Sequence, residues 1–409
     1  MTDIQKQLFQ KNIKRVNTIL KITGLFLNEY EEKLNLKIYF KQRWFFCLNF
    51  LCIFYDVISQ ITWLVQKFYT GISLVELTYS GPCLAICILG CFKSYYFIKN
   101  MPHIYKFIKT LSVLYYVERN QMTDMNKRIE DYMQYRVKFL SIGLYTLSFF
   151  DGLGIITFGV GPILISFSNY YATGNLHLLL PFFLAYPFDS SDIRYWPIAY
   201  VHQIWSAIVA VFTVLGPDNF FYTSCVLLDV QFFQLKHEIE SIFDYDDLTL
   251  NNFRFKLKDI VDRHRELLRC VNLLDSAFSK SSLCNILTSS LLICFTGFNV
   301  MAYDNLLVVI PFISFLFMVI GQIYLLCYYG DLILKSSAEI SNAVYNCGWY
   351  KVKSTVVKNL MIISYRAQKP CKLTSFGFAD INIVVFTKIM SRSWSYFALL
   401  WSFHRNDLQ

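Results

Sequence analysis

A stripe of small, mostly polar side chains runs along the last apolar segment of the chain. Ser391, Ser395 and Ser402 are spaced by intervals that share one face of a helix, and Ala398 falls between them. The other faces carry large apolar and aromatic residues. Two interpretations are open. The stripe lines a water-filled path, or it lets helices pack closely while the serines bond to their own backbone.

Ionisable side chains inside apolar segments are the second group that could carry a function. Asp56 and Asp151 lie in two such segments, and Arg392 directly follows Ser391. A charge in hydrocarbon is costly, so these residues must reach a cavity, water or a partner. We expect Asp151 to border a cavity and Asp56 to bond to a neighbouring helix. Arg392 is expected on a hydrated wall or in an ion pair.

The sequence offers little for catalysis. Its twelve cysteines include no CxxC pair, and no cluster of His, Cys and Asp has the spacing of metal ligands. No metal, no cofactor and no enzymatic activity are therefore expected, and no nucleic-acid motif accompanies the basic segments.

The elements that must position these residues are membrane helices. Of the 409 residues, 55% are hydrophobic and only 16% are charged. Crossing a hydrocarbon core takes about 20 apolar residues in a helix. Seven spans are predicted, at 44–65, 75–92, 139–166, 198–220, 282–301, 306–329 and 378–403.

The positive charges predict the orientation of these spans. Most of the 38 Lys and Arg lie in four alternate segments, whereas the other connections hold only Lys67, Arg194 and Arg405. Cytoplasmic loops attract Lys and Arg, so the N-terminus is expected in the cytoplasm and the C-terminus outside. The four basic segments are 1–43, 93–136, 231–272 and 331–375.

Two amphipathic segments extend the predicted membrane domain. Residues 253–275 read as a helix that runs into the fifth span, and 354–366 as a short helix before the last one. The fourth span is expected to break at Gly216-Pro217 and to continue as a cytosolic helix. We interpret these parts as a packed cytosolic layer; the alternative is that they lie on the lipid surface.

These expectations give an all-α membrane protein with seven transmembrane helices and a helical anchor region. Its parts are a cytoplasmic N-terminal segment (1–43), spans one to four (44–230), a cytoplasmic helical loop (231–281), spans five and six (282–330), a second cytoplasmic loop with an anchor helix (331–376), and the last helix with the C-terminus (377–409).

The orientation argues against a G-protein-coupled receptor, whose N-terminus lies outside. The sequence also lacks a DRY-type triplet after its third span and an NPxxY in its seventh. A transporter or membrane enzyme would need clustered ionisable residues or broken helices in two symmetry-related halves. Neither is visible.

The stretch SYFALLWSF at 395–403 resembles the signature that ends the last helix of insect chemoreceptors. That signature is Thr-Tyr, five hydrophobic residues and Gln-Phe; here Ser395 replaces Thr and Ser402 replaces Gln. Further family-like stretches are LPFFLAYPFD at 180–189, RYWPIAYVHQ at 194–203 and PCKLTSFGFADINIVVFTKIM at 370–390. Together they resemble an insect odorant receptor. The related gustatory receptors remain the alternative, and a G-protein-coupled receptor is a weaker one.

The resemblance implies an odorant-gated, nonselective cation channel with four subunits around one pore. The second cytoplasmic loop is short, as in a ligand-specific subunit, which would form a hetero-oligomer, a tetramer in this family, with the shared odorant receptor coreceptor. Such a protein spans the plasma membrane of a sensory-neuron dendrite several times. Its other partners are a small volatile odorant and membrane lipid, not nucleic acid.

The resemblance also assigns residues to two sites. The hydrophobic constriction of the pore falls on Leu399, with Ser402 one turn outward. Together with the small-residue stripe and Arg392, these give the candidate pore residues Ser391, Arg392, Ser395, Ala398, Leu399 and Ser402. Family pockets lie in the outer half of spans two to six, where the candidates are Tyr79, Cys83, Phe149, Phe150, Asp151, Tyr200, Ile204, Trp205, Ile208, Phe298 and Met301.

Overall fold

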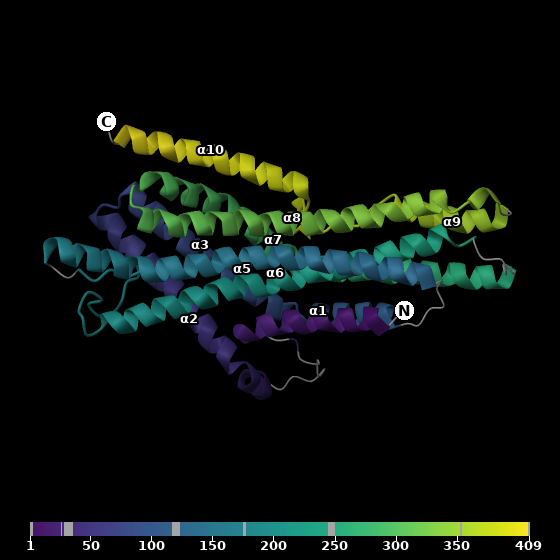
Figure 1. The fold of residues 1–409 in the computed structure, drawn as a ribbon, viewed down its shortest axis with the longest axis horizontal. Coiled ribbons are helices and arrows are strands. Elements are labelled where there is room, and N and C mark those ends of the chain that lie inside the picture. The colour runs from purple at the N-terminus through teal and green to yellow at the C-terminus, as the bar shows by residue number, and fades with distance from the viewer. Residues whose placement is uncertain are drawn as a thin grey trace.

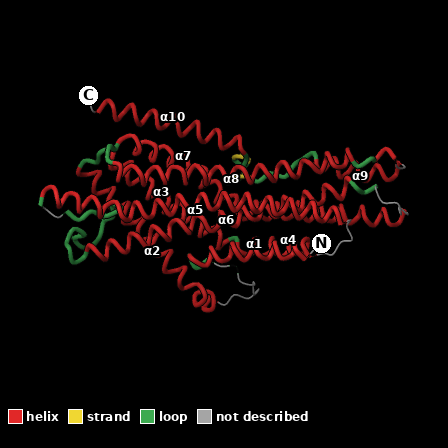
Figure 2. Tube along the Cα trace, in the orientation of Figure 1, coloured by secondary structure: helices red, strands yellow, loops and turns green. Residues whose placement is uncertain are grey.

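The computed structural model is a bundle of long helices (Figure 1). Helix accounts for nearly all of the trace, with one short pair of strands just before the last helix (Figure 2). We call the end with the α5–α6 connection and the C-terminus the outer end, and the end with α9 the inner end. The structure describes residues 3–25, 27, 36–116, 123–174, 177–243, 250–351 and 354–407.

Helices of very different length make up the bundle. In order they are α1 (Asp3–Ile22), α2 (Leu36–Thr70), α3 (Leu74–Lys99), α4 (Met101–Tyr116), α5 (Thr123–Thr173), α6 (Trp196–Glu240), α7 (Leu250–Ala302), α8 (Leu306–Asn346), α9 (Ser354–Ala367) and α10 (Ile383–Asp407). A 3₁₀ turn, η1 (Trp349–Lys351), precedes α9, and the antiparallel strands β1 (Thr374–Ser375) and β2 (Ala379–Asp380) precede α10.

Six helices within the described part of the chain are long and apolar enough to cross a membrane: α2, α3, α5, α6, α7 and α8. Each of the first six predicted spans lies inside one of them. Several of these helices extend well past the membrane length toward the inner end, because their inner halves pack against one another rather than against lipid.

The seventh predicted span, 378–403, begins too early. Residues 374–380 form the β1–β2 hairpin, whose turn holds Phe376 and Gly377 with φ of 51° and 75°. Positive φ angles cannot continue a right-handed helix, so α10 starts only at Ile383. Its 25 residues still span about 37 Å, enough to cross a bilayer. In Figure 1, α10 lies along one side of the bundle, next to α7 and α8.

The expected break in the fourth span is wrong, because α6 runs through Gly216 and Pro217 without interruption. The lost backbone donor of proline is tolerated here inside a fully packed helix. A side chain at Gly216 would begin 3.0 Å from Cδ2 of Leu20, so the glycine lets α1 pack closely on α6. The predicted continuation of the helix past this point is confirmed.

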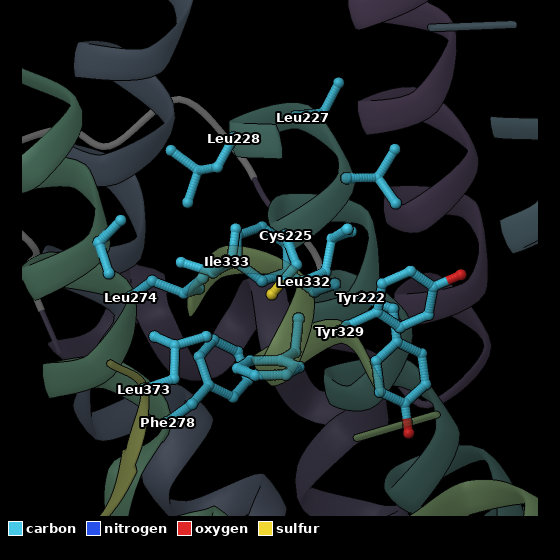
Figure 3. Packing of buried hydrophobic residues seen from close by; sticks show 14 of the residues in the cluster. Tyr222, Cys225, Leu227, Leu228, Leu274, Phe278, Tyr329, Leu332, Ile333 and Leu373 are labelled. Atoms are coloured by element: carbon cyan, nitrogen blue, oxygen red, sulfur yellow. The ribbon is translucent and has the colours of Figure 1, made fainter. Parts of the chain in front are cut away.

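The inner half of α6 forms the core of the protein. All residues from Gly216 to Phe232 are buried. Figure 3 shows part of this core, where side chains of α6, α7 and α8 converge with Leu373. Tyr222 and Tyr329 stack there, with ring centroids 5.4 Å apart. The segment therefore behaves like the interior of a soluble helical protein.

Both amphipathic predictions are confirmed as helices. The segment 253–275 is the inner half of α7, which packs against α4, α6 and α8, and 354–366 is α9, which packs on α8. Their apolar stripes, including Leu267, Val271 and Leu360, are buried against these neighbours. The inner helices therefore form a packed layer.

A buried ion pair ties three membrane helices together. Lys93 of α3 donates from Nζ to both carboxylate oxygens of Asp218 on α6, at 2.8 and 2.6 Å. Gln322 of α8 donates its amide to the same carboxylate at 2.7 Å. The prediction that Lys93 belongs to a basic loop is wrong: Lys93 lies inside α3 and is buried, where Asp218 of α6 neutralises it.

We predict that Lys93→Met destabilises the protein strongly, because it leaves the Asp218 carboxylate buried without a cation. Breaking a buried ion pair from one side costs about 3–5 kcal/mol. The measurement is the melting temperature of the detergent-solubilised protein. Lys335→Met is the matched control, because that lysine is exposed and pairs with Asp331 on its own helix.

A double variant shows whether the loss of stability comes from the unpaired Asp218 carboxylate. Lys93→Met with Asp218→Leu should regain much of the lost stability, since an apolar replacement of both partners can be close to neutral. A melting temperature for Lys93→Met as high as that of Lys335→Met would contradict a structural role for the pair.

Candidate functional site

A cavity lies in the outer half of the bundle, enclosed by α2, α3, α5, α6 and α8 and by the connection between α5 and α6. The empty space between its walls is ≈ 810 Å³, including the part that opens to the surroundings. Its walls are mostly apolar. The apolar side chains include Ile86, Phe150, Ile155, Phe158, Leu184, Val211, Phe312, Phe315 and Met318.

A few polar side chains face this apolar space. They are Asp56, Gln60, Asp151, Gln203 and Ser206, and all are buried. Among the described residues, no hydrogen-bond partner is found for Oδ1 of Asp56, Oε1 of Gln60 or Oδ2 of Asp151. Buried polar atoms are normally satisfied, so unpartnered ones at a cavity wall mark a place for a ligand or water.

The connection between α5 and α6 closes the outer side of the cavity. Gln203 holds it with two hydrogen bonds: its amide nitrogen donates to the carbonyl of Phe182 (3.1 Å), and its amide oxygen accepts from the Phe182 backbone N–H (2.9 Å). Ser59 donates to the carbonyl of Ala185 at 2.7 Å. These bonds fix the segment LPFFLAY, so Phe182 and Leu184 form part of the wall.

His202 lies behind the cavity wall, between Asp56 of α2 and Tyr186 of the α5–α6 connection. Its Nδ1 lies 3.1 Å from the hydroxyl of Tyr186 and 3.9 Å from Oδ1 of Asp56. Its Nε2 lies 3.5 Å from Sγ of Cys52. Burial raises the pKa of the Tyr186 phenol, so this hydroxyl stays neutral and can act as donor or acceptor.

Three of the eleven proposed ligand residues line the cavity: Cys83, Phe150 and Asp151. On α6 the prediction has the wrong helical phase. Ile204 and Ile208 each follow a lining residue of α6, Gln203 and Ala207, and Trp205 precedes another, Ser206. One residue turns a helix by about 100°. Tyr200, Ile204, Trp205 and Ile208 therefore fall outside the lining.

The other proposed ligand residues lie around the cavity or away from it. Tyr79 donates its hydroxyl to the carbonyl of Pro181 at 3.1 Å and packs on Phe312 from behind the wall. Phe149 is 64% exposed, and Met301 is also exposed. Phe298 is buried against α10, and α7 contributes no residue to the cavity lining.

Two of the lining residues that were not predicted, Gln60 and Gln203, could have been found from the sequence. Gln60 and Gln203 are polar residues inside apolar segments, as Asp151 is, and the same argument would have selected them. Asp56 was noticed and assigned to a neighbouring helix; it faces the cavity and lies near His202.

The small-residue stripe of α10 faces away from the bundle. Ser391, Ser395, Ala398 and Ser402 are exposed, while Ser393 on the opposite face is buried. Leu399 and Arg392 lie beside the stripe and are exposed as well. Ser395 donates to the backbone carbonyl of Ser391 at 3.1 Å, so the serine is compatible with either interpretation of the stripe.

Arg392 forms no ion pair with another residue in the described part of this chain. The expected alternative, a partner carboxylate in the inner layer of the same chain, therefore finds no support. Arg392 is exposed on the outward side of α10.

Solved structures of an insect olfactory receptor share this fold. The receptor OR5 from Machilis hrabei in complex with eugenol superposes with a TM-score of 0.81, covering 97% of this chain and 99% of that one at 18% identity. A second structure of OR5 superposes with a TM-score of 0.79 over 96% of this chain and 97% of that one, at 19% identity.

Sequence comparison agrees with the fold. Odorant receptor 92a of Drosophila melanogaster is 24% identical over 361 residues, which cover 88% of this chain and 86% of that protein. Odorant receptor 85b of the same species is 35% identical over 144 residues, or 35% of this chain and 37% of that protein. The family model described as 7tm Odorant receptor matches residues 73–394, from the start of α3 into α10. The chain therefore belongs to the insect odorant receptor family.

Proposed function

We propose that this odorant receptor is the ligand-specific subunit of an odorant-gated cation channel, and that the outer cavity is its odorant site. The observation that carries the proposal is the cavity itself. Sites for small ligands are usually preformed, mostly apolar spaces with a few polar groups. The cavity has both properties and lies inside the membrane helices of a receptor, not of an enzyme.

The exposed stripe of α10 supports a role in the pore. In a tetramer, this helix and its counterparts in the other subunits would surround a central axis; Ser391, Ser395 and Ser402 would then face water, and Leu399 would contribute to a hydrophobic ring. Such a ring can gate a channel by losing its water. In a single chain the stripe has no cover, which fits a surface that is completed by other subunits.

Helix α8 could couple the two sites, because it takes part in both. Phe312, Phe315 and Met318 face the cavity, and one turn or more further along, Tyr324 packs edge-on against Phe386 of α10 with ring centroids 5.5 Å apart. A ligand that shifts the outer part of α8 would therefore change the packing of α10. The coupling requires two arrangements of this contact that the ligand distinguishes.

The remaining assignments belong to the same proposal. The chain is a membrane protein with six apolar spanning helices and α10. We place it in the plasma membrane of sensory-neuron dendrites, in a heterotetramer with the shared coreceptor. We place the inner helical layer in the cytoplasm, because its segments are rich in positive charges. We reject the alternative of a gustatory receptor, because the family model that matches this chain is that of odorant receptors.

Two glycines of α5 provide a matched test of the proposed site. Gly154 lines the cavity, and a Cβ there would lie 3.3 Å from Oγ of Ser314 on α8, whereas a Cβ at Gly152 would meet no atom within 4 Å. Gly154→Leu should fill part of the cavity and raise the odorant concentration for half-maximal current at least ~tenfold, since overpacking costs roughly 1–3 kcal/mol. Gly152→Leu adds the same side chain on the same helix and should leave potency nearly unchanged.

The experiment records currents from cells that express each variant with or without the coreceptor, against a panel of odorants. Surface labelling must show equal amounts of both variants. A rapid current that needs both subunits and resists G-protein block supports the proposal. Equal potency in the two glycine variants would move the odorant site elsewhere, and the absence of any odorant-evoked current would remove the channel assignment.

Arg392 tests the proposed pore wall. If it faces the aqueous path, Arg392→Gln should raise single-channel cation conductance or change rectification, because it removes a positive charge that repels the permeant ions. Arg392→Glu should move conductance further in the same direction. Arg194→Gln, in the exposed α5–α6 connection, removes an equal charge far from α10 and serves as the control.

Odorant potency should change little in these Arg392 variants, because the residue is not part of the cavity. Channels that assemble poorly but conduct normally would make Arg392 a structural partner of another subunit and would contradict its place on the pore wall.

A further inference from the structure

The chemistry of the cavity wall restricts the kind of ligand that fits it. Two carboxylic acid side chains line the cavity, Asp56 and Asp151, and neither a lysine nor an arginine nor a histidine is among the lining residues of the described chain. The site is therefore acidic as well as apolar. In hydrocarbon surroundings a carboxylate needs a positive or hydrogen-donating partner.

The two carboxylates differ in their surroundings. Asp56 has a basic neighbour just behind the wall, since its Oδ1 lies 3.9 Å from Nδ1 of His202. Asp151 is only 7% exposed, and its Oδ2 has no hydrogen-bond partner among the described residues. Asp151 is thus the carboxylate that the protein leaves for something inside the cavity.

The unpartnered polar atoms at the wall are oxygens of Asp56, Gln60, Asp151 and Ser206, and of these only the Ser206 hydroxyl can also donate as a neutral group. The amide of Gln203, a possible donor, is used on the backbone of Phe182. A ligand that can only accept hydrogen bonds, such as a ketone or an ester, could accept from the Ser206 hydroxyl but would leave the oxygens of Asp56, Gln60 and Asp151 without a donor. A ligand with N–H donors and a positive charge would satisfy them, because hydrogen bonds between ionised partners are the strong ones.

We infer that this cavity selects a small volatile amine, with its nitrogen at the Asp151 carboxylate and its hydrocarbon part against the apolar wall. The inference rests on the proposed odorant site and adds the chemical class of its ligand. The hydrocarbon part would contact Ile86, Phe158, Phe312 and Met318, which carry no charge, while the second carboxylate, Asp56, already has His202 beside it. The ligand is therefore a monoamine with an alkyl or aromatic tail.

The test compares two probes with the same number of carbon atoms, hexylamine and methyl butyl ketone. The purified complex of receptor and coreceptor is heated with increasing amounts of each probe. A ligand that binds the folded state raises the melting temperature in a concentration-dependent way. For the unaltered receptor, hexylamine should act at concentrations at least ~tenfold lower than the ketone, the usual difference for a hydrogen bond to a charged group.

Asp151→Asn keeps the size of the side chain and removes its charge, so it should lower the ratio of amine to ketone affinity by roughly tenfold or more. Asp331→Asn makes the same change outside the cavity, where the carboxylate pairs with exposed Lys335, and should leave the ratio unchanged. Should Asp151→Asn not fold, the comparison of the two probes on the unaltered receptor decides by itself.

Failure of this inference and failure of the proposed function give different results. Equal binding of the two probes, no stabilisation by hexylamine, or an unchanged ratio in Asp151→Asn would each overturn the amine. The cavity would remain the odorant site if Gly154→Leu still weakened the response to another volatile. If Gly154→Leu weakened no response at all, the site itself would be wrong.

Discussion

The ion pair between Lys93 and Asp218 fixes the relative positions of α3, α6 and α8. Along α6, Asp218 lies two turns, about 10 Å, further toward the inner end than the lining residue Val211. A membrane offers no water to polar groups, so each charge must find a partner within the protein or a water-filled space. Gln322 completes the set by donating to the same carboxylate. The three helices joined by this ion pair also line the cavity, so they cannot move apart without leaving a buried charge unpaired.

The same constraint separates structural polar residues from those available to a ligand. Lys93, Asp218 and Gln322 satisfy one another, and Gln203 satisfies the backbone of the segment that closes the cavity. Asp151 stands apart from them, because its Oδ2 remains without a partner in the described chain while its side chain is buried. An acidic, mostly apolar cavity is the result. The packed inner core from Gly216 to Phe232 supplies the rigidity that holds these positions.

The sequence predicts the helices well, because length and hydropathy are local properties. The six apolar spans and both amphipathic helices follow from them. The rotation of a helix about its axis does not, since α6 is apolar on all sides and gives no phase. Ile204 was therefore chosen where Ala207 lines the cavity. Lys93 was assigned to a loop because its partner lies 125 residues away. Asp151 could be predicted, since a carboxylate inside a span is costly wherever it points.

The most direct measurement is a cryo-electron microscopy map of the complex with the coreceptor, bound to an odorant that opens the channel. We predict ligand density in the outer cavity, next to Asp151 and Phe182, with the Ser391–Ser402 face of α10 on a central pore. Ligand density between subunits or on the lipid-facing surface, with the cavity unoccupied, would contradict it.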